Sequence, residues 1–197
     1  VEESGSFGQA VSLTSAYATP VTISSPSGLI ARQVVIEHST DSTCGVFEDS
    51  TGTSTVICWG EQTAVGYTAS TPVTTLADLP VEDSNGNDLS LSEVSQSPYD
   101  ITDIQSGERI NCVLSRQGLI KCWGYGPHLG IGLASGNIGD SNPVTEEMGE
   151  YLGYVELGDN ITAKQLSVAD NHACALLESG EVSCWGDNHY KESSSSV

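Results

Sequence analysis

The residues best suited to chemistry in this chain are its six cysteines, which occur in three pairs. The second cysteine of each pair begins a Cys-Trp-Gly tripeptide, at residues 58–60, 122–124 and 184–186. Paired thiols can form disulfides, remain reduced inside a core or bind zinc. Zinc is the least favoured of the three, because the sequence has no Cys-x-x-Cys spacing of the kind that structural zinc sites use.

No other residues have the spacing of a catalytic site. The sequence has no phosphate-binding glycine loop, no Gly-x-Ser-x-Gly elbow and no recognisable Ser-His-acid set. Residues 81–93, VEDSNGNDLSLSE, hold several acids and amides, yet their spacing departs from an EF-hand and favours an Asn-Gly hairpin turn over a calcium loop. We therefore expect a protein that is not an enzyme, with no catalytic residues, no cofactor and no metal.

The charge of the chain is strongly negative. Six Lys and Arg stand against 26 Asp and Glu in 197 residues, a formal net charge of -20. Nucleic-acid binding needs basic surface that releases counterions from phosphates, so this balance argues against a nucleic-acid partner. It also disfavours an anionic membrane surface, and no stretch approaches the roughly 20 apolar residues of a membrane span.

The elements that position the cysteines are repeated. Three similar segments have their first cysteines at Cys44, Cys112 and Cys174, which lie 68 and 62 residues apart. Each segment has a β-rich run, a hairpin, the Trp-Gly pair, a Gly-rich loop and a strand containing Pro-Val, at 72–73 and 143–144 in the first two copies. Four short antiparallel strands per unit are typical of a propeller blade. The sequence thus predicts an all-β fold of three blades, forming a partial or open propeller.

The repeats also indicate how the cysteines pair. The turns 116–118 and 178–180 end in Gly, which suits a three-residue hairpin loop and places the two cysteines of each hairpin opposite one another. Six cysteines allow 15 pairings, and the repeat symmetry selects one set, leaving three reduced pairs as the alternative. The predicted disulfides are Cys44–Cys58, Cys112–Cys122 and Cys174–Cys184. Disulfides imply an oxidising compartment, so we expect a secreted or cell-surface protein.

The segments CVLSRQGLIKCWG, HLGIG and HACALLESGEVSCWGDN resemble the regulator of chromosome condensation repeat family. The resemblance covers about residues 30–186 and implies a β-propeller, which in that family typically has seven blades. The cystine-bearing pattern is similar to secreted members rather than to the nuclear exchange factor. No residue here matches the nucleotide-exchange surface of that factor, and the acidic charge conflicts with chromatin binding, so the resemblance does not imply that activity.

The N-terminus looks like half of a repeat. Within residues 6–23, Phe7-Gly8 aligns with 129–130, and Thr19-Pro20-Val21 aligns with 142–144. The last copy lacks this half. We therefore expect these units: 1–23, a half-repeat donated to the next subunit; 24–76, a first blade; 77–145, a second blade; 146–188, an incomplete third blade; 189–197, a Ser-rich tail.

This arrangement predicts head-to-tail assembly. Three blades cannot close a ring, and strand addition between copies uses main-chain hydrogen bonds for affinity. We expect an extracellular structural protein that forms helical filaments. The alternatives are a secreted binding module for a protein or glycan, either as a closed six-bladed dimer or within a larger propeller, and a chain that is one period of a longer polypeptide. The residues assigned to assembly are Phe7, Gly8, Thr19, Pro20, Val21, Ile23, Val182, Trp185 and Gly186.

Glycans are the remaining expected partners. The sequence Asn160-Ile161-Thr162 is the one Asn-x-Ser/Thr sequon, and it directly precedes a predicted strand. Ser- and Thr-rich stretches permit O-glycans as well.

Overall fold

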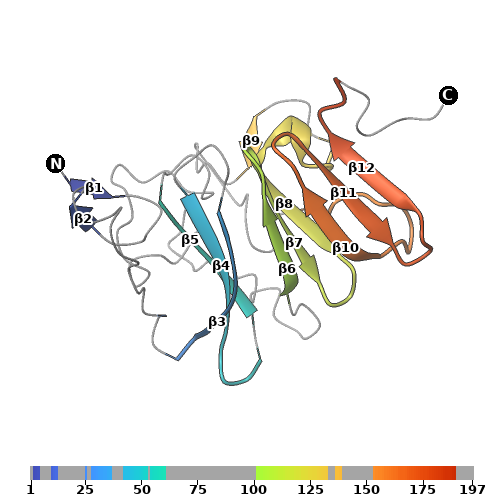
Figure 1. Cartoon of the computed structure of the whole chain (residues 1–197). Coiled ribbons are helices and arrows are strands. Elements are labelled where there is room, and N and C mark those ends of the chain that lie inside the picture. Colours follow the sequence, from blue (N-terminus) through green and yellow to red (C-terminus); the bar gives the residue numbers. More distant parts are fainter. Residues whose placement is uncertain are drawn as a thin grey trace.

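The computed structural model describes residues 2–4, 10–12, 25, 28–36, 42–52, 54–60, 101–132, 136–138 and 153–189. These residues form twelve strands and one short 3-10 helix (Figure 1). The elements are β1 Glu2–Ser4, β2 Ala10–Ser12, β3 Ile30–Ile36, β4 Ser42–Glu48, β5 Ser54–Gly60, β6 Ile101–Ser106, β7 Ile110–Ser115, β8 Ile120–Tyr125, η3 Gly126–His128, β9 Asn137–Ile138, β10 Ala163–Val168, β11 His172–Leu177 and β12 Val182–Gly186.

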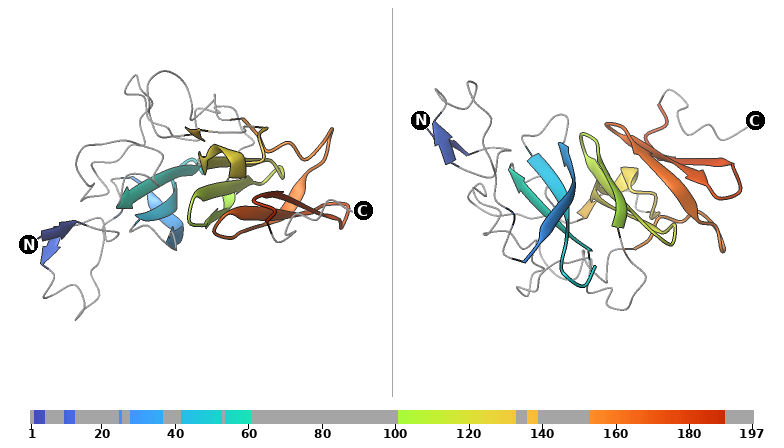
Figure 2. Two further views of the ribbon diagram at one scale, coloured as in Figure 1. Left: turned by 90° about the horizontal axis from the view of Figure 1, so that it is seen from above. Right: turned by 60° about the horizontal axis from the view of Figure 1, so that its bottom comes forward.

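Three antiparallel sheets stand side by side and form the predicted blades (Figures 1 and 2). Blade 1 is β3-β4-β5, blade 2 is β6-β7-β8-β9 and blade 3 is β10-β11-β12, each in sequence order. A separate pair, β1 with β2, lies near the N-terminus. The described residues therefore confirm an all-β fold of open sheets. Among them no helix is long and apolar enough to cross a membrane.

The hairpins have the predicted register. Cys44 pairs with Cys58, Cys112 with Cys122 and Cys174 with Cys184 across adjacent strands, and each pair is a disulfide. The turn before β8 closes with hydrogen bonds between Ser115 and Leu119 and from the Gly118 N–H to the Ser115 carbonyl. Gly118 has φ of 78°, a left-handed conformation that glycine adopts without steric cost.

The first strands of the blades are equivalent in detail. Each contains a register shift at the same place, between Ala31 and Gln33, Ile101 and Asp103, and Ala163 and Gln165. β3 contacts β6, and β6 contacts β10, so the first strands of neighbouring blades lie next to one another. This is the arrangement expected of the inner strands of a propeller.

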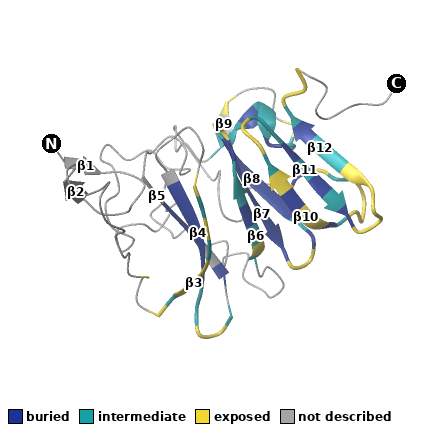
Figure 3. Ribbon diagram, viewed as in Figure 1, coloured by how far each residue is buried: buried dark blue, intermediate teal, exposed yellow. Residues whose placement is uncertain are grey.

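The core lies between the sheets, because the buried apolar side chains cluster where neighbouring sheets meet. In Figure 3 the buried stretches are prominent on β4, β7 and β8. One apolar cluster joins blade 1 to blade 2 and the other joins blade 2 to blade 3. Blade 2 is covered on both faces, and all six residues of β7 are buried.

Several sequence predictions lie outside the described residues. These are the Pro-Val segments at 72–73 and 143–144, the 81–93 turn, the tail after residue 189, and most of the half-repeat. The fourth strand of blade 2 is Asn137–Ile138, which pairs with β8 through Gly124↔Ile138 and Tyr125↔Asn137. It precedes the predicted Pro-Val segment in sequence. The predicted unit boundaries stay predictions.

Candidate interaction surfaces on the two outer blades

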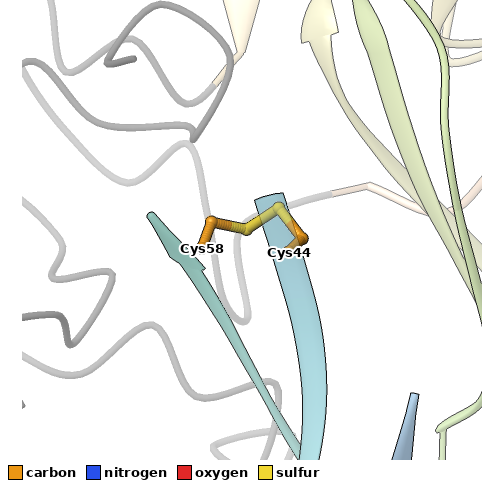
Figure 4. Close-up of a disulfide and its surroundings, with 2 residues drawn as sticks. All are labelled: Cys44 and Cys58. Carbon is orange, nitrogen blue, oxygen red and sulfur yellow. A yellow bond between two sulfur atoms is a disulfide. The ribbon is translucent and has the colours of Figure 1, made fainter. Parts of the chain in front are cut away.

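The two interfaces between blades follow one rule. The disulfide of one blade faces the following blade, and the tryptophan of that following blade packs in the same cluster. Cys44 and Cys58 of blade 1 share a cluster with Trp123 of blade 2. Cys112 and Cys122 of blade 2 share the other cluster with Trp185 of blade 3. Figure 4 shows the first of these disulfides bridging β4 and β5.

A glycine loop of blade 2 lies close to the tryptophan of blade 3. At the second interface, a Cβ added to Gly130 would lie 2.7 Å from Cδ1 of Trp185. Gly130 also has φ of 69°, so both its space and its backbone require glycine. At this interface, therefore, the loop of blade 2 that contains Leu129 and Gly130 packs on the indole of blade 3.

Blade 3 presents a face of the disulfide-bearing kind with no blade against it among the described residues. Val182 is 65% exposed, whereas its equivalents Ile120 in blade 2 and Val56 in blade 1 are 1% and 6% exposed. Cys174 and Cys184 are partly exposed, whereas the other four cysteines are buried. We name Gln165, Ser167, Cys174, Leu176, Val182 and Cys184 the tail face.

Blade 1 presents exposed apolar side chains on its opposite face. Val34 is 61% exposed, whereas its equivalents Ile104 and Leu166 are 0% and 3% exposed in the two interfaces. Ile36 is exposed as well. Phe47 on β4 and Ile57 on β5 are buried, so among the side chains whose burial the structure describes, the exposed apolar ones of this face lie on β3. We name Val34 and Ile36 the head face.

The tail face and the head face are the two halves of an interface that occurs twice inside the chain. The tail face corresponds to the surfaces of blades 1 and 2 that pack against the next blade along the chain. The head face corresponds to the first strands of blades 2 and 3, which pack against the preceding blade. Among the described residues neither face has a neighbouring blade, and the residue types are those of the buried interfaces. Exposed apolar side chains at positions that are buried elsewhere in a repeat mark a candidate site for binding another protein.

The structure separates the residues that the sequence assigned to assembly. Val182 lies on the tail face. Trp185 is buried on the other side of blade 3, against blade 2, and Gly186 ends β12 at that blade's outer edge. Phe7, Gly8, Thr19, Pro20, Val21 and Ile23 lie outside the described residues. Asn160 is exposed, with φ of 58°, in the turn before β10.

Sequence reasoning missed the head face. Its signal was available in the repeat alignment, since Val34 occupies the place of Ile104 and Leu166. The one-residue bulge in each first strand hid it, because a bulge reverses the alternation of side chains from that point onward.

Electrostatic features near these faces are modest. Arg32 binds Glu48 through two hydrogen bonds of 2.9 and 2.8 Å on the surface of blade 1. The hydrogen bonds from Arg32 lower the pKa of the Glu48 carboxyl below its usual range. Burial lowers the pKa of His128, and nearby Asp187 opposes that shift. In the described part of the chain, no three His, Cys, Asp or Glu side chains gather as they would around a metal ion.

Comparison with known proteins supports the repeat and the fold. Residues 163–192 match the model of the regulator of chromosome condensation (RCC1) repeat. Among curated proteins, no sequence matches significantly. The fold is similar to yeast RCC1 (Prp20) in complex with Kap60, with a TM-score of 0.52 and 15% identity, and to human WBSCR16, with a TM-score of 0.54 and 18% identity.

The two solved proteins are longer than this chain. The match covers 80% of this chain and 32% of the yeast protein, and 93% of this chain and 42% of the human protein. At these identities the likeness concerns the fold alone. Residues 163–192 thus match one regulator of chromosome condensation repeat, and the blades have a β-propeller fold similar to that of yeast RCC1.

Proposed function

We propose that this chain is a non-catalytic extracellular protein whose function is to bind further copies of itself, head to tail, into filaments. The observation that carries the proposal is the exposure of Val34 and Val182 at positions that are buried in both interfaces within the chain. A second copy is the occupant that fits, because it offers each face the surface that the internal interfaces already use.

The apolar content of the two faces gives the contact its driving force. Burying a Val, Leu or Ile side chain contributes about 1.5–3 kcal/mol. The tail face supplies Leu176 and Val182, and the head face supplies Val34 and Ile36. The contact joins two different surfaces, so it is heterologous: it gives a ring where the rotation closes and a filament where it does not.

Strand exchange between copies is the second element of the proposal. Blade 2 has a fourth strand, β9, whereas blade 3 has three strands among the described residues. We propose that residues 6–23 of one copy supply the fourth strand to blade 3 of another, beside Gly186. Main-chain hydrogen bonds along a sheet edge would add affinity to the packing of the faces. Deleting residues 1–23 should then weaken assembly while the three disulfide hairpins stay intact.

A closed pair is the main alternative to a filament. Two copies supply six blades, which lies within the range of about 4–8 blades seen in propellers. The three disulfides support an extracellular location, because such bonds persist in oxidising compartments.

The test is the mass of the 197-residue chain as a function of concentration, measured by light scattering after chromatography. The wild-type chain should form species larger than one copy, and Val34→Asp and Val182→Arg should each reduce them to single copies. Ile161→Arg is the matched control, since Ile161 is an exposed apolar residue outside both faces. A wild-type chain that stays a single copy would refute self-assembly and favour a propeller module that binds a different protein or a glycan.

A further inference from the structure

A glutamine side chain joins blade 1 to blade 2 at the level of the first strands. The Gln33 amide nitrogen donates to the backbone carbonyl of Ile104 at 3.0 Å, and the Ile104 N–H donates to the Gln33 amide oxygen at 3.2 Å. The same amide nitrogen also donates to a carboxylate oxygen of Asp103 at 2.7 Å. The side chain therefore caps one residue of the free edge of β6 with both of its polar groups.

Blade 3 has a glutamine at the same position. Gln165 follows the bulge of β10 as Gln33 follows the bulge of β3, and it lies on the tail face. Gln165 is exposed, and no hydrogen bond joins its side-chain amide to another described residue. Blade 2 has Asp103 at the equivalent position. The glutamine therefore occurs at the interface between blades 1 and 2 and on the tail face of blade 3.

The residue that would receive Gln165 is on the head face. Val34 pairs with Gly45 as Ile104 pairs with Val113, one position beyond the bulge in each case. Since β3 and β6 are both edge strands of their sheets, the backbone N–H and C=O of Val34 point to the free edge as those of Ile104 do.

We propose that the Gln165 side chain of one copy binds the backbone N–H and C=O of Val34 in a second copy and thereby sets the register of the head-to-tail contact. This inference rests on the proposed function, and it names the polar group that decides how the two faces align. An apolar face alone tolerates sliding, whereas an amide that must meet both a donor and an acceptor is satisfied in one alignment.

The experiment isolates a single interface. A Val34→Asp copy keeps only its tail face, and a Val182→Arg copy keeps only its head face, so their mixture should form a particle of two copies with one contact. Gln165→Ala is then introduced into either copy. In the Val34→Asp copy it lies at the contact, and in the Val182→Arg copy it lies on the disabled face, so the same substitution serves as its own control.

Sedimentation velocity should give a dissociation constant about tenfold higher with Gln165→Ala in the Val34→Asp copy, as expected when a buried hydrogen-bonding group loses its partner. The constant should be unchanged with the substitution in the other copy. Equal constants in both placements would overturn the role of Gln165 and leave the proposed function standing. A mixture that forms no two-copy particle would overturn both. Circular dichroism of each variant verifies that the fold is retained. We expect Gln165→Ala to preserve it, because Gln165 is exposed.

Discussion

Blade 2 and blade 3 have nearly the same hairpin and differ in what lies beyond it. In blade 2, Ile120 and the disulfide of β7 and β8 pack under blade 3 and are fully buried. In blade 3, Val182 and the equivalent disulfide remain exposed or partly exposed. The residue types are alike and the register is the same, so the difference comes from the neighbour and not from the local sequence. A repeat protein buries its blades by stacking them, and an outer blade keeps the surface that stacking would cover.

The largest expected effect on the free energy of unfolding comes from placing an aspartate at the same hairpin position in blade 2 and in blade 3. Ile120→Asp places an unpaired carboxylate in the second interface and should lower the free energy of unfolding by about 3–5 kcal/mol. Val182→Asp should change it by about 0.5 kcal/mol or less in the single-copy state, because the side chain is exposed. Denaturant unfolding under non-reducing conditions measures both. Similar losses for the two variants would contradict the contrast between the blades.

A second comparison uses two glycines of one loop. Gly130 and Gly132 both have positive φ, but only Gly130 lies against Trp185. Gly130→Ala should lower the free energy of unfolding by about 2–4 kcal/mol through backbone strain and overpacking of the indole. Gly132→Ala carries the backbone strain alone and should cost about 1 kcal/mol. Equal costs, measured by thermal unfolding, would show that the loop does not hold Trp185.

The disulfides should differ in their accessibility to a reductant. A thiol–disulfide exchange reagent must reach a sulfur atom, and only Cys174 and Cys184 have side chains that are partly exposed. Brief mild reduction followed by alkylation and peptide mass spectrometry should label this pair about tenfold faster than the other two. Labelling should slow at concentrations where the copies assemble. Equal labelling of all three pairs would contradict the burial of the first two.

The smallest effect concerns the surface ion pair of blade 1. The pKa of Glu48 is lower in the folded chain than in the unfolded chain, so the pair stabilises the fold above the usual carboxylate range. This contribution is lost as the pH falls through the lowered pKa of Glu48. A Glu48→Gln variant should therefore unfold at a slightly lower temperature near neutral pH and at the same temperature in strong acid. Because both groups are exposed, the difference should be the least of those considered.

The sequence was sufficient to predict the blades, because the hairpin signals are local. In the second and third hairpins, a Gly ends the three-residue turn and the two cysteines are equally distant from the middle of that turn, so the sequence determines strand, register and disulfide together. Trp185 was assigned to assembly from the half-repeat and not from the hairpin, and the structure buries it against blade 2. Which face of a strand meets which neighbour depends on contacts between blades and on the bulges in the first strands. These are not visible in the spacing of one repeat.

The sequence spacing within one repeat also does not predict what binds the head face or the tail face. Gln33 and Gln165 are both glutamines in the sequence, but the role we propose for Gln165 follows only from the contact of Gln33 with Ile104. Val34 aligns with Ile104 and Leu166 in the repeats, but that alignment identifies a surface only once those two residues are seen to be buried. The sequence predicted that the chain would join head to tail; the structure supplies the surfaces through which we propose that it does so.

The most direct test of this account is the mass of an equimolar mixture of the Val34→Asp and Val182→Arg chains. Each variant alone should be a single copy at every concentration, because one of its two faces is disabled. The mixture should contain particles of two copies and nothing larger, since only one intact contact can form. Assembly of either variant by itself, or a mixture that remains entirely single copies while the wild-type chain assembles, would contradict the head-to-tail contact of these two faces.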